Sequence, residues 1–309
     1  MTPDVATDKA DVEKAYLACQ AIARSRARNF YYAFVALPAP RRNAICAIYA
    51  FMRRADDLAD DDESAPREER LRRLEAWLGG WRAACRGGET TDPVFIAMRH
   101  AMERFAIPPA LLEELVAGIT LDLKPTAADA PDTYATFEDL YGYCYGVASV
   151  VGLACIRIFG YKDRNAEKLA EETGIAFQLT NILRDVAEDA ERKRIYLPLE
   201  NLKAHGVSPE SLLNRTPGAP PTPAERRLFE EIAQRAESYY KSARALVPLI
   251  DRESRPAMWV LFSIYHNLLE RIERADYDVF SRRISVPTAQ KLGILAIGQA
   301  RMALARLSV

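Results

Sequence analysis

The sequence predicts an all-α protein, and three observations lead to that prediction. The 309 residues are 49% hydrophobic but include only 14 glycines, so the chain can bury a large core yet offers few of the turns that an all-β protein needs. Apolar residues recur with helical spacing in about ten segments. Two sets of polar residues step by three or four positions, which places each set on one face of a helix.

Short segments rich in proline, glycine or aspartate separate the expected helices. The clearest lie at residues 37–40, 86–93, 124–132 and 216–223. None is long enough to require a second domain, and the two polar sets must meet across most of these breaks if they act together. We therefore expect residues 1–309 to form a single domain in which residues 1–20 are loosely ordered.

The first polar set consists of Tyr49, Arg53, Asp56 and Asp60. By itself, an acid-rich run of this kind is commonly no more than the solvated end of a helix. The second set, further along the chain, changes that interpretation. It consists of Gln178, Asn181, Asp185 and Asp189.

An apolar stripe accompanies the second polar set on the same expected helix. The stripe is formed by Ile175, Leu179, Ile182, Leu183 and Val186. A helix buried along this stripe carries Asp185 and Asp189 to one side of it, and carboxylates that line a cleft require partners.

A divalent metal together with a diphosphate fits between two such acidic faces. Mg²⁺ usually binds through one or two carboxylates plus the oxygens of a substrate phosphate. Arg53, Gln178 and Asn181 add the hydrogen-bond donors that carboxylates lack. A bound metal draws negative charge onto a leaving oxygen, so the pattern indicates ionisation of an allylic diphosphate rather than hydrolysis.

Other classes of function lack support in the sequence. The net charge of −1 gives no global basic excess for binding nucleic acid. No glycine-rich nucleotide loop of the dinucleotide-binding or Walker type occurs. His100, His205 and His266 show no metal-ligand spacing, so we expect each to be a surface or helix-cap residue.

Cysteine usage and hydropathy predict a cytoplasmic protein. The five cysteines are an odd number at spacings that match no zinc or redox motif, which is typical of free thiols in a reducing compartment. Residues 1–14 are polar and acidic, unlike a secretory signal. The longest apolar run, residues 147–159, contains Arg157 and is too short to span a bilayer.

Three parts of the chain resemble signatures of the squalene and phytoene synthase family. Residues 29–38 and 48–60, which include IYAFMRRADDLAD, resemble its first signature. Residues 178–189, which read QLTNILRDVAED, closely resemble its second signature together with residues 194–198. Residues 141–152 resemble its central helix. The resemblance extends over most of the chain.

This resemblance implies an all-α isoprenoid synthase bundle with a central cavity and the aspartates at its mouth. It implies binding of Mg²⁺, or alternatively Mn²⁺, by Asp56, Asp60, Asp185 and Asp189. It implies binding of diphosphate by Tyr49, Arg53, Gln178, Asn181, Tyr265 and Arg282. Tyr143 matches a tyrosine near the reacting carbons. From the residues alone, Arg282 could equally be a surface arginine and Tyr143 a core aromatic.

The reaction implied is the joining of two identical prenyl diphosphates at their C1 carbons. One substrate loses diphosphate to give an allylic cation, and the double bond of the other attacks it. Proton loss then closes a cyclopropane that still carries diphosphate. Aromatic walls would exclude water from the cation, and Phe30, Phe34 and Tyr143 are candidates for that role.

The residues favour a C15 substrate over a C20 substrate. Phe34, one turn from Phe30, would shorten the tail pocket, whereas the small Cys46 argues the other way. We favour condensation of two farnesyl diphosphates to presqualene diphosphate or squalene, on the bacterial squalene and hopanoid side of the family. Phytoene synthesis from two geranylgeranyl diphosphates is the alternative. Squalene formation would need NADPH, for which no site is recognisable.

One departure from the family pattern concerns the first signature. Ala27 stands close to a position where many relatives have serine, and Arg28 or Asn29 would have to replace its contact with phosphate.

Two further classes of function stay open. A head-to-tail prenyltransferase or terpene cyclase also uses aspartate-rich helices, although residues 181–189 lack the cyclase metal motif. A lipid carrier would not need four metal-binding aspartates. Because the implied substrates are greasy, we also expect weak peripheral membrane attachment near Arg282, Arg283, Lys291 and Arg301.

Overall fold

The computed structural model describes residues 9–60, 65–121, 132–216 and 218–307. In chain order its α-helices are α1 (Lys9–Arg26), α2 (Arg28–Val35), α3 (Ala39–Asp60), α4 (Arg67–Cys85), α5 (Pro93–Phe105), α6 (Pro109–Leu121), α7 (Phe137–Cys144), α8 (Val150–Phe159), α9 (Asn165–Glu191), α10 (Leu199–His205), α11 (Pro209–Leu213), α12 (Pro223–Leu246), α13 (Arg255–Arg274) and α14 (Thr288–Leu307). A π-helical turn, η1 (Tyr145–Ser149), joins α7 to α8, and a 3₁₀ turn, η2 (Val247–Leu249), follows α12. The short strands β1 (Asp132–Thr133) and β2 (Arg194–Ile195) pair in parallel.

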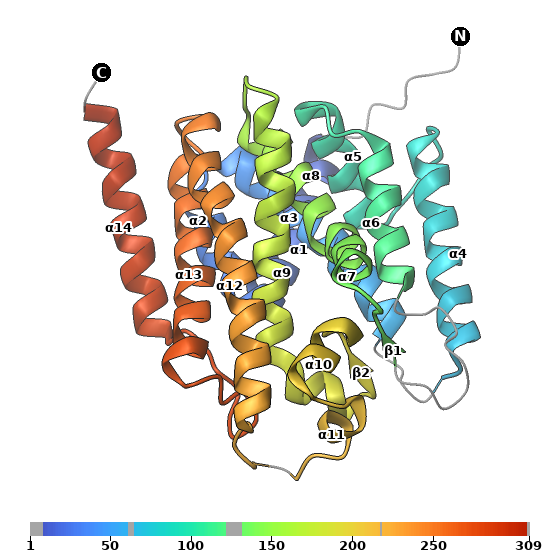
Figure 1. The fold of residues 1–309 in the computed structure, drawn as a ribbon. Helices are drawn as coiled ribbons and strands as arrows, with labels where there is room; N and C mark the ends of the chain where they lie inside the picture. Colours follow the sequence, from blue (N-terminus) through green and yellow to red (C-terminus); the bar gives the residue numbers. More distant parts are fainter. Residues whose placement is uncertain (1–8, 61–64, 122–131, 217, 308–309) are drawn as a thin grey trace.

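The helices form a bundle around α9, which confirms the expected all-α class (Figure 1). α9 packs most extensively against α12 and also contacts η1, α8 and α13. The proline-rich breaks fall close to where expected, since Leu37 and Pro38 lie between α2 and α3, and residues 218–222 lead into α12, which begins at Pro223. The break at residues 124–132 lies almost wholly outside the described residues.

The expectation of loose order in residues 1–20 is wrong for the part that the structure describes. Residues 9–20 belong to α1, which packs against α3 and α5. Tyr16 and Cys19 are buried, and the Tyr16 hydroxyl lies 2.7 Å from His100 Nδ1. Burial of these side chains against the rest of the protein stabilises α1.

Close backbone approach at two glycines brings η1 against its neighbours. A Cβ on Gly118 of α6 would lie 2.5 Å from the Gly146 carbonyl oxygen, and a Cβ on Gly174 of α9 would lie 2.6 Å from Ser149 Cα. Only glycine fits at such distances. The Ser149 hydroxyl is buried and donates to the Glu171 carbonyl at 2.7 Å, which ties η1 to α9.

Residues 137–159 form one continuous helical run that is long and apolar enough to cross a membrane by length and composition. The run exceeds the apolar segment expected from the sequence because α7, η1 and α8 are continuous. It packs between α6 and α9 inside the bundle. A helix in the core of a soluble protein can be as long and as apolar as a membrane-spanning helix, so length and composition do not distinguish the two.

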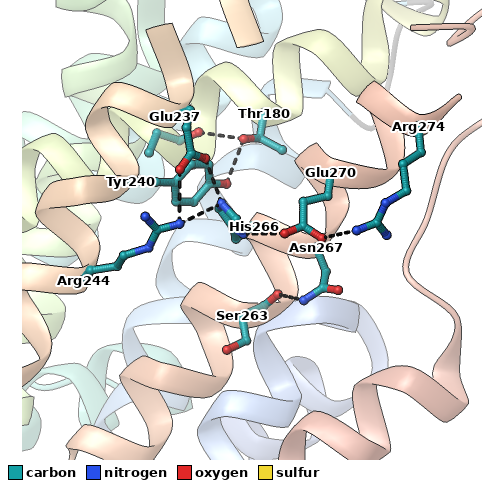
Figure 2. A network of polar contacts seen from close by, with 10 residues as sticks. Thr180, Glu237, Tyr240, Arg244, Ser263, His266, Asn267, Glu270 and Arg274 are labelled. Carbon is teal, nitrogen blue, oxygen red and sulfur yellow. Dashed lines mark hydrogen bonds and ion pairs between the residues drawn. The ribbon is translucent and has the colours of Figure 1, made fainter. Parts of the chain in front are cut away.

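A polar network joins α12 to α13 (Figure 2). His266 lies between Glu237 and Glu270, with ring nitrogens 2.7 and 3.2 Å from their carboxylates. The buried Tyr240 hydroxyl lies 2.8 Å from Thr180 Oγ1 and links α12 to α9. His266 is therefore an interhelical partner rather than the surface or cap residue that we expected.

Candidate active site

Two adjoining hollows lie between α3, η1 and α9. The first, which we call the apolar cavity, has a volume of about 150 Å³. The second, the polar pocket, has a volume of about 380 Å³ and is lined by residues that include Asp56, Tyr143, Arg184 and Asp185. Four residues line both: Met52, Val147, Gln178 and Asn181. The charged pocket thus leads directly into an apolar interior.

Aromatic rings from four helices surround one side of the apolar cavity. Phe30 and Phe34 of α2 pack against Tyr49 of α3, with ring centroids 6.4 and 6.1 Å away. Tyr265 of α13 lies 5.4 Å from Phe30 and 4.5 Å from Phe177, the latter pair being stacked. The expected wall residues Phe30 and Phe34 both line this cavity.

Tyr265 and Asn181 connect the aromatic side to the polar pocket. Burial raises the pKa of Tyr265 to about 12, and Asn181 hydrogen-bonds its hydroxyl. That hydroxyl therefore stays protonated at neutral pH. The Asn181 amide nitrogen also donates to Gln178 Oε1 at 3.3 Å, whereas its own oxygen, which is buried, has no hydrogen-bond partner among the described residues. A buried amide oxygen of this kind is suited to accept a hydrogen bond from a bound group.

The first polar set divides between the two hollows. Tyr49 lines the apolar cavity, and burial raises the pKa of its hydroxyl. Asp56 lines the polar pocket. Arg53, expected to contact diphosphate, forms an ion pair with Asp57 one turn away, with a nitrogen–oxygen distance of 2.5 Å.

The second polar set reaches the pocket except at its last member. Gln178, Asn181 and Asp185 all line the polar pocket. Asp185 accepts from Arg184 Nε at 2.8 Å and from Arg283 Nη2 at 2.9 Å, and Arg283 also pairs with Glu188 at 2.7 Å.

Asp189 instead borders a separate small hollow with Arg194 and Tyr196. Burial, and then the Asp185 charge, raise the pKa of Asp189 to about 7. The protonated carboxyl is therefore favoured below about pH 7, and a positive group beside it would favour the ionised form.

Tyr143 lines the polar pocket and belongs to a group of three packed tyrosines. Tyr143 is buried, and its ring lies 4.9 Å from that of Tyr196, which follows β2, and 5.4 Å from that of Tyr134, which follows β1. Pairing of β1 with β2 therefore aligns the trio. The sequence interpretation had singled out only Tyr143, because the pairing of these strands is not visible in helical periodicity.

Three of the residues named from the sequence have side chains outside the described residues. They are Asp60, the last residue of α3, and Arg28 and Asn29, which begin α2. Arg282 is exposed, whereas the adjacent Arg283 contacts Asp185. Arg184 and Arg283 were both missed as site residues. A buried arginine beside an aspartate is the signal that would have revealed Arg184, because a buried guanidinium requires a partner.

The donor set fits a magnesium ion only together with a phosphate group. Among the described residues, no group of three or more histidine, cysteine or acidic side chains lies close enough to hold a metal. Asp56 and Asp185 nevertheless face one pocket from α3 and α9. Magnesium sites built from one or two carboxylates are completed by water and phosphate oxygens, so these residues suit that arrangement.

A family profile described as squalene/phytoene synthase matches residues 23–290. The chain belongs to the squalene/phytoene synthase family. A 15-cis-phytoene synthase of Synechocystis sp. is 34% identical over 305 residues, which cover 94% of this chain and 86% of that protein. A phytoene synthase of Mycobacterium tuberculosis is 36% identical over 288 residues, which cover 93% of this chain and 91% of that protein.

Solved structures share the fold of this squalene/phytoene synthase family member. A dehydrosqualene synthase in complex with a ligand superposes with a TM-score of 0.82 at 30% identity, covering 95% of this chain and 98% of that one. A squalene synthase from Alicyclobacillus acidocaldarius gives a TM-score of 0.77 at 26% identity, covering 88% of this chain and 97% of that one. The resemblance inferred from the signatures is confirmed. The chain is a prenyltransferase of the type that condenses prenyl diphosphates head to head.

Proposed function

We propose that the protein condenses two farnesyl diphosphates to presqualene diphosphate. The observation behind this proposal is the junction of the two hollows at Met52, Val147, Gln178 and Asn181. A prenyl diphosphate has a highly charged head and an apolar tail. A charged pocket that opens into an apolar cavity matches that shape and polarity.

The polar pocket holds the diphosphate heads in this proposal. Asp56 and Asp185 would bind magnesium, which when bound draws negative charge onto the leaving oxygen. Gln178 and Asn181 offer amide groups at the junction, where C1 of the substrate meets its diphosphate. Arg184, buried beside Asp185, adds a cation that offsets charge on the departing diphosphate.

The apolar side protects the allylic cation that ionisation creates. Phe30, Phe34 and Phe177 present hydrocarbon and ring surface to the cavity, which excludes the water that would quench a cation. Tyr143, at the polar pocket, lies where its ring face can stabilise positive charge. In this proposal the Tyr143 hydroxyl relays the proton lost when the cyclopropane closes, accepting it while its own proton passes to the released diphosphate.

The choice of a C15 tail rests on the side chains that fill the cavity. Phe34 occupies the cavity beside Tyr49, and Phe159 and Ile156 line it at the end of α8. The small Cys46 is buried but is not one of the lining residues, so its size leaves no extra space in this cavity. These contacts favour the shorter substrate.

Synthesis of phytoene from two geranylgeranyl diphosphates is the second candidate. It is favoured by the two relatives described above, which are named phytoene synthases. Reduction of presqualene diphosphate to squalene would require NADPH as a reductant.

Product analysis with each substrate tests the proposal. The purified protein is incubated with Mg²⁺ and either farnesyl or geranylgeranyl diphosphate, with and without NADPH. We expect a C30 cyclopropyl diphosphate from the C15 substrate and little product from the C20 substrate. Phe34→Ala should raise C20 turnover relative to C15 turnover, while Leu17→Ala, at an exposed site on α1, should leave the ratio unchanged. Preferential formation of phytoene by the unaltered protein would replace the proposal with the second candidate.

A further inference from the structure

On the side of α14 that faces away from the bundle, the exposed residues described between Leu292 and Ala303 are apolar except for Arg301. Its exposed residues there include Leu292, Gly293, Ala296, Ile297, Ala300 and Ala303. We call this set the outer face of α14. Leu292 and Ile297 are 52% and 51% exposed. A surface helix of a soluble protein normally turns a polar side outward, whereas the outward side of α14 is largely apolar.

The fold does not require an apolar outer face. α14 stands at the edge of the bundle and packs against α13 and α2 through its opposite side (Figure 1). Ile294 and Gly298 are buried on that side, and a Cβ on Gly298 would lie 2.6 Å from Val260 Cγ2. The packing of α14 is therefore complete without the outer face, which is left to contact something else.

Charge around α14 is strongly asymmetric. Residues 279–307 include five basic residues and no aspartate or glutamate, although the whole chain has a net charge of −1. Arg301 is exposed at the border of the outer face, with its guanidinium 4.2 Å from the centre of the Trp259 ring. An apolar helix face with basic residues beside it has the composition of a helix that lies in a membrane interface.

We infer that the outer face of α14 docks on the surface of an anionic lipid bilayer. A symmetric contact with a second copy fits the charge less well, because it would bring together two α14 helices that each include three basic residues and no aspartate or glutamate. An anionic bilayer supplies hydrocarbon for the apolar outer face and negative charge for the basic residues beside it.

The location of α14 also connects the bilayer with the polar pocket. Arg283, which contacts Asp185 at that pocket, precedes the first residue of α14 by five positions. Five residues span at most about 18 Å, so the start of the docking helix lies near the diphosphate site. If the proposed function holds, apolar substrates and products need only a short path between membrane and cavity.

Vesicle flotation tests this inference. The full chain is mixed with vesicles of phosphatidylcholine alone or of phosphatidylcholine with phosphatidylglycerol, at low and high salt. We expect flotation with the anionic vesicles that weakens as salt rises. Leu292→Glu combined with Ile297→Glu should lower the partition coefficient by at least about tenfold, since two aliphatic side chains lose their burial. Leu17→Glu, at a position that is 59% exposed on α1, is the matched control and should float like the unaltered protein.

Three results would overturn the inference. The first is a protein that stays in the aqueous fraction, and the second is a double variant that floats as well as the unaltered protein. The third is a lipid-free dimer that is dissociated by the double substitution, as measured by light scattering, which would make the outer face an interface between copies. Thermal melts of both variants check that they fold. The vesicles contain no prenyl diphosphate, so the outcome is independent of the proposed reaction.

Discussion

Gly174 lies where α9 comes closest to η1, and replacing it with alanine should be costly. The added Cβ would sit 2.6 Å from Ser149 Cα and 2.7 Å from Ser149 N, about 1 Å inside normal contact. Both neighbours are backbone atoms, so relief requires η1 to move. Overpacking of this kind costs up to about 3 kcal/mol, and alanine recovers about 1 kcal/mol of helix propensity. We expect a net loss of about 2 kcal/mol.

Thermal unfolding measures this loss, which for a chain of this length corresponds to a fall of about 3 °C in Tm. Gly142→Ala in α7 is the matched control, because nothing lies within 4 Å of its added Cβ. That variant should gain about 0.5–1 kcal/mol. Gly174 also lines the apolar cavity, so condensation should slow in its variant alone. Equal stability of the two variants would refute the close approach of α9 and η1.

Three further changes test separate contacts. Asp189→Asn should stabilise the metal-free protein by on the order of 2 kcal/mol at pH 8 and not at pH 4. The pKa of Asp189 is raised from 3.8 to about 7, so ionisation of this carboxyl destabilises the folded protein as pH rises through that range. A gain in the free energy of unfolding that is larger at pH 4, measured by denaturant titration, would contradict this. Arg283→Gln frees Asp185 from a half-exposed ion pair and should tighten calorimetric Mg²⁺ binding roughly threefold, whereas weaker binding would show that the arginine does not compete with the metal. Tyr240→Phe removes a buried hydrogen bond to Thr180 and should cost about 1 kcal/mol in urea unfolding, and an unchanged midpoint would count against that bond.

Helical spacing was enough to predict which side chains share a face of a helix. It does not predict the hydrogen-bond or ion-pair partner of each side chain. The steps between Gln178, Asn181 and Asp185 correctly bring these residues to one pocket, facing Asp56. Arg53, which the resemblance assigns to diphosphate, pairs in this structure with an aspartate one turn away on its own helix, and its contact with diphosphate stays a prediction. Spacing fixes the direction of a Cβ, while the rotamer of a long side chain depends on the nearest charge.

Contacts between distant segments were beyond the reach of the sequence. Arg283 meets Asp185 across 98 residues, and the loop that brings it there carries no periodic signal. The resemblance singled out Arg282, one position earlier, whose contact with diphosphate stays a prediction. The tyrosine trio likewise depends on a two-residue strand pair that is too short to predict.

The most direct test of the central claim is the rate at which diphosphate leaves farnesyl diphosphate in the presence of Mg²⁺, compared between the unaltered protein and Asp185→Asn. Asp11→Asn is the control, because Asp11 is an exposed aspartate on α1, away from the polar pocket. The account predicts release that depends on Mg²⁺, falls by about a hundredfold or more in Asp185→Asn, and is unchanged in the control. Equal release by all three proteins would contradict the assignment of the polar pocket as the site of ionisation.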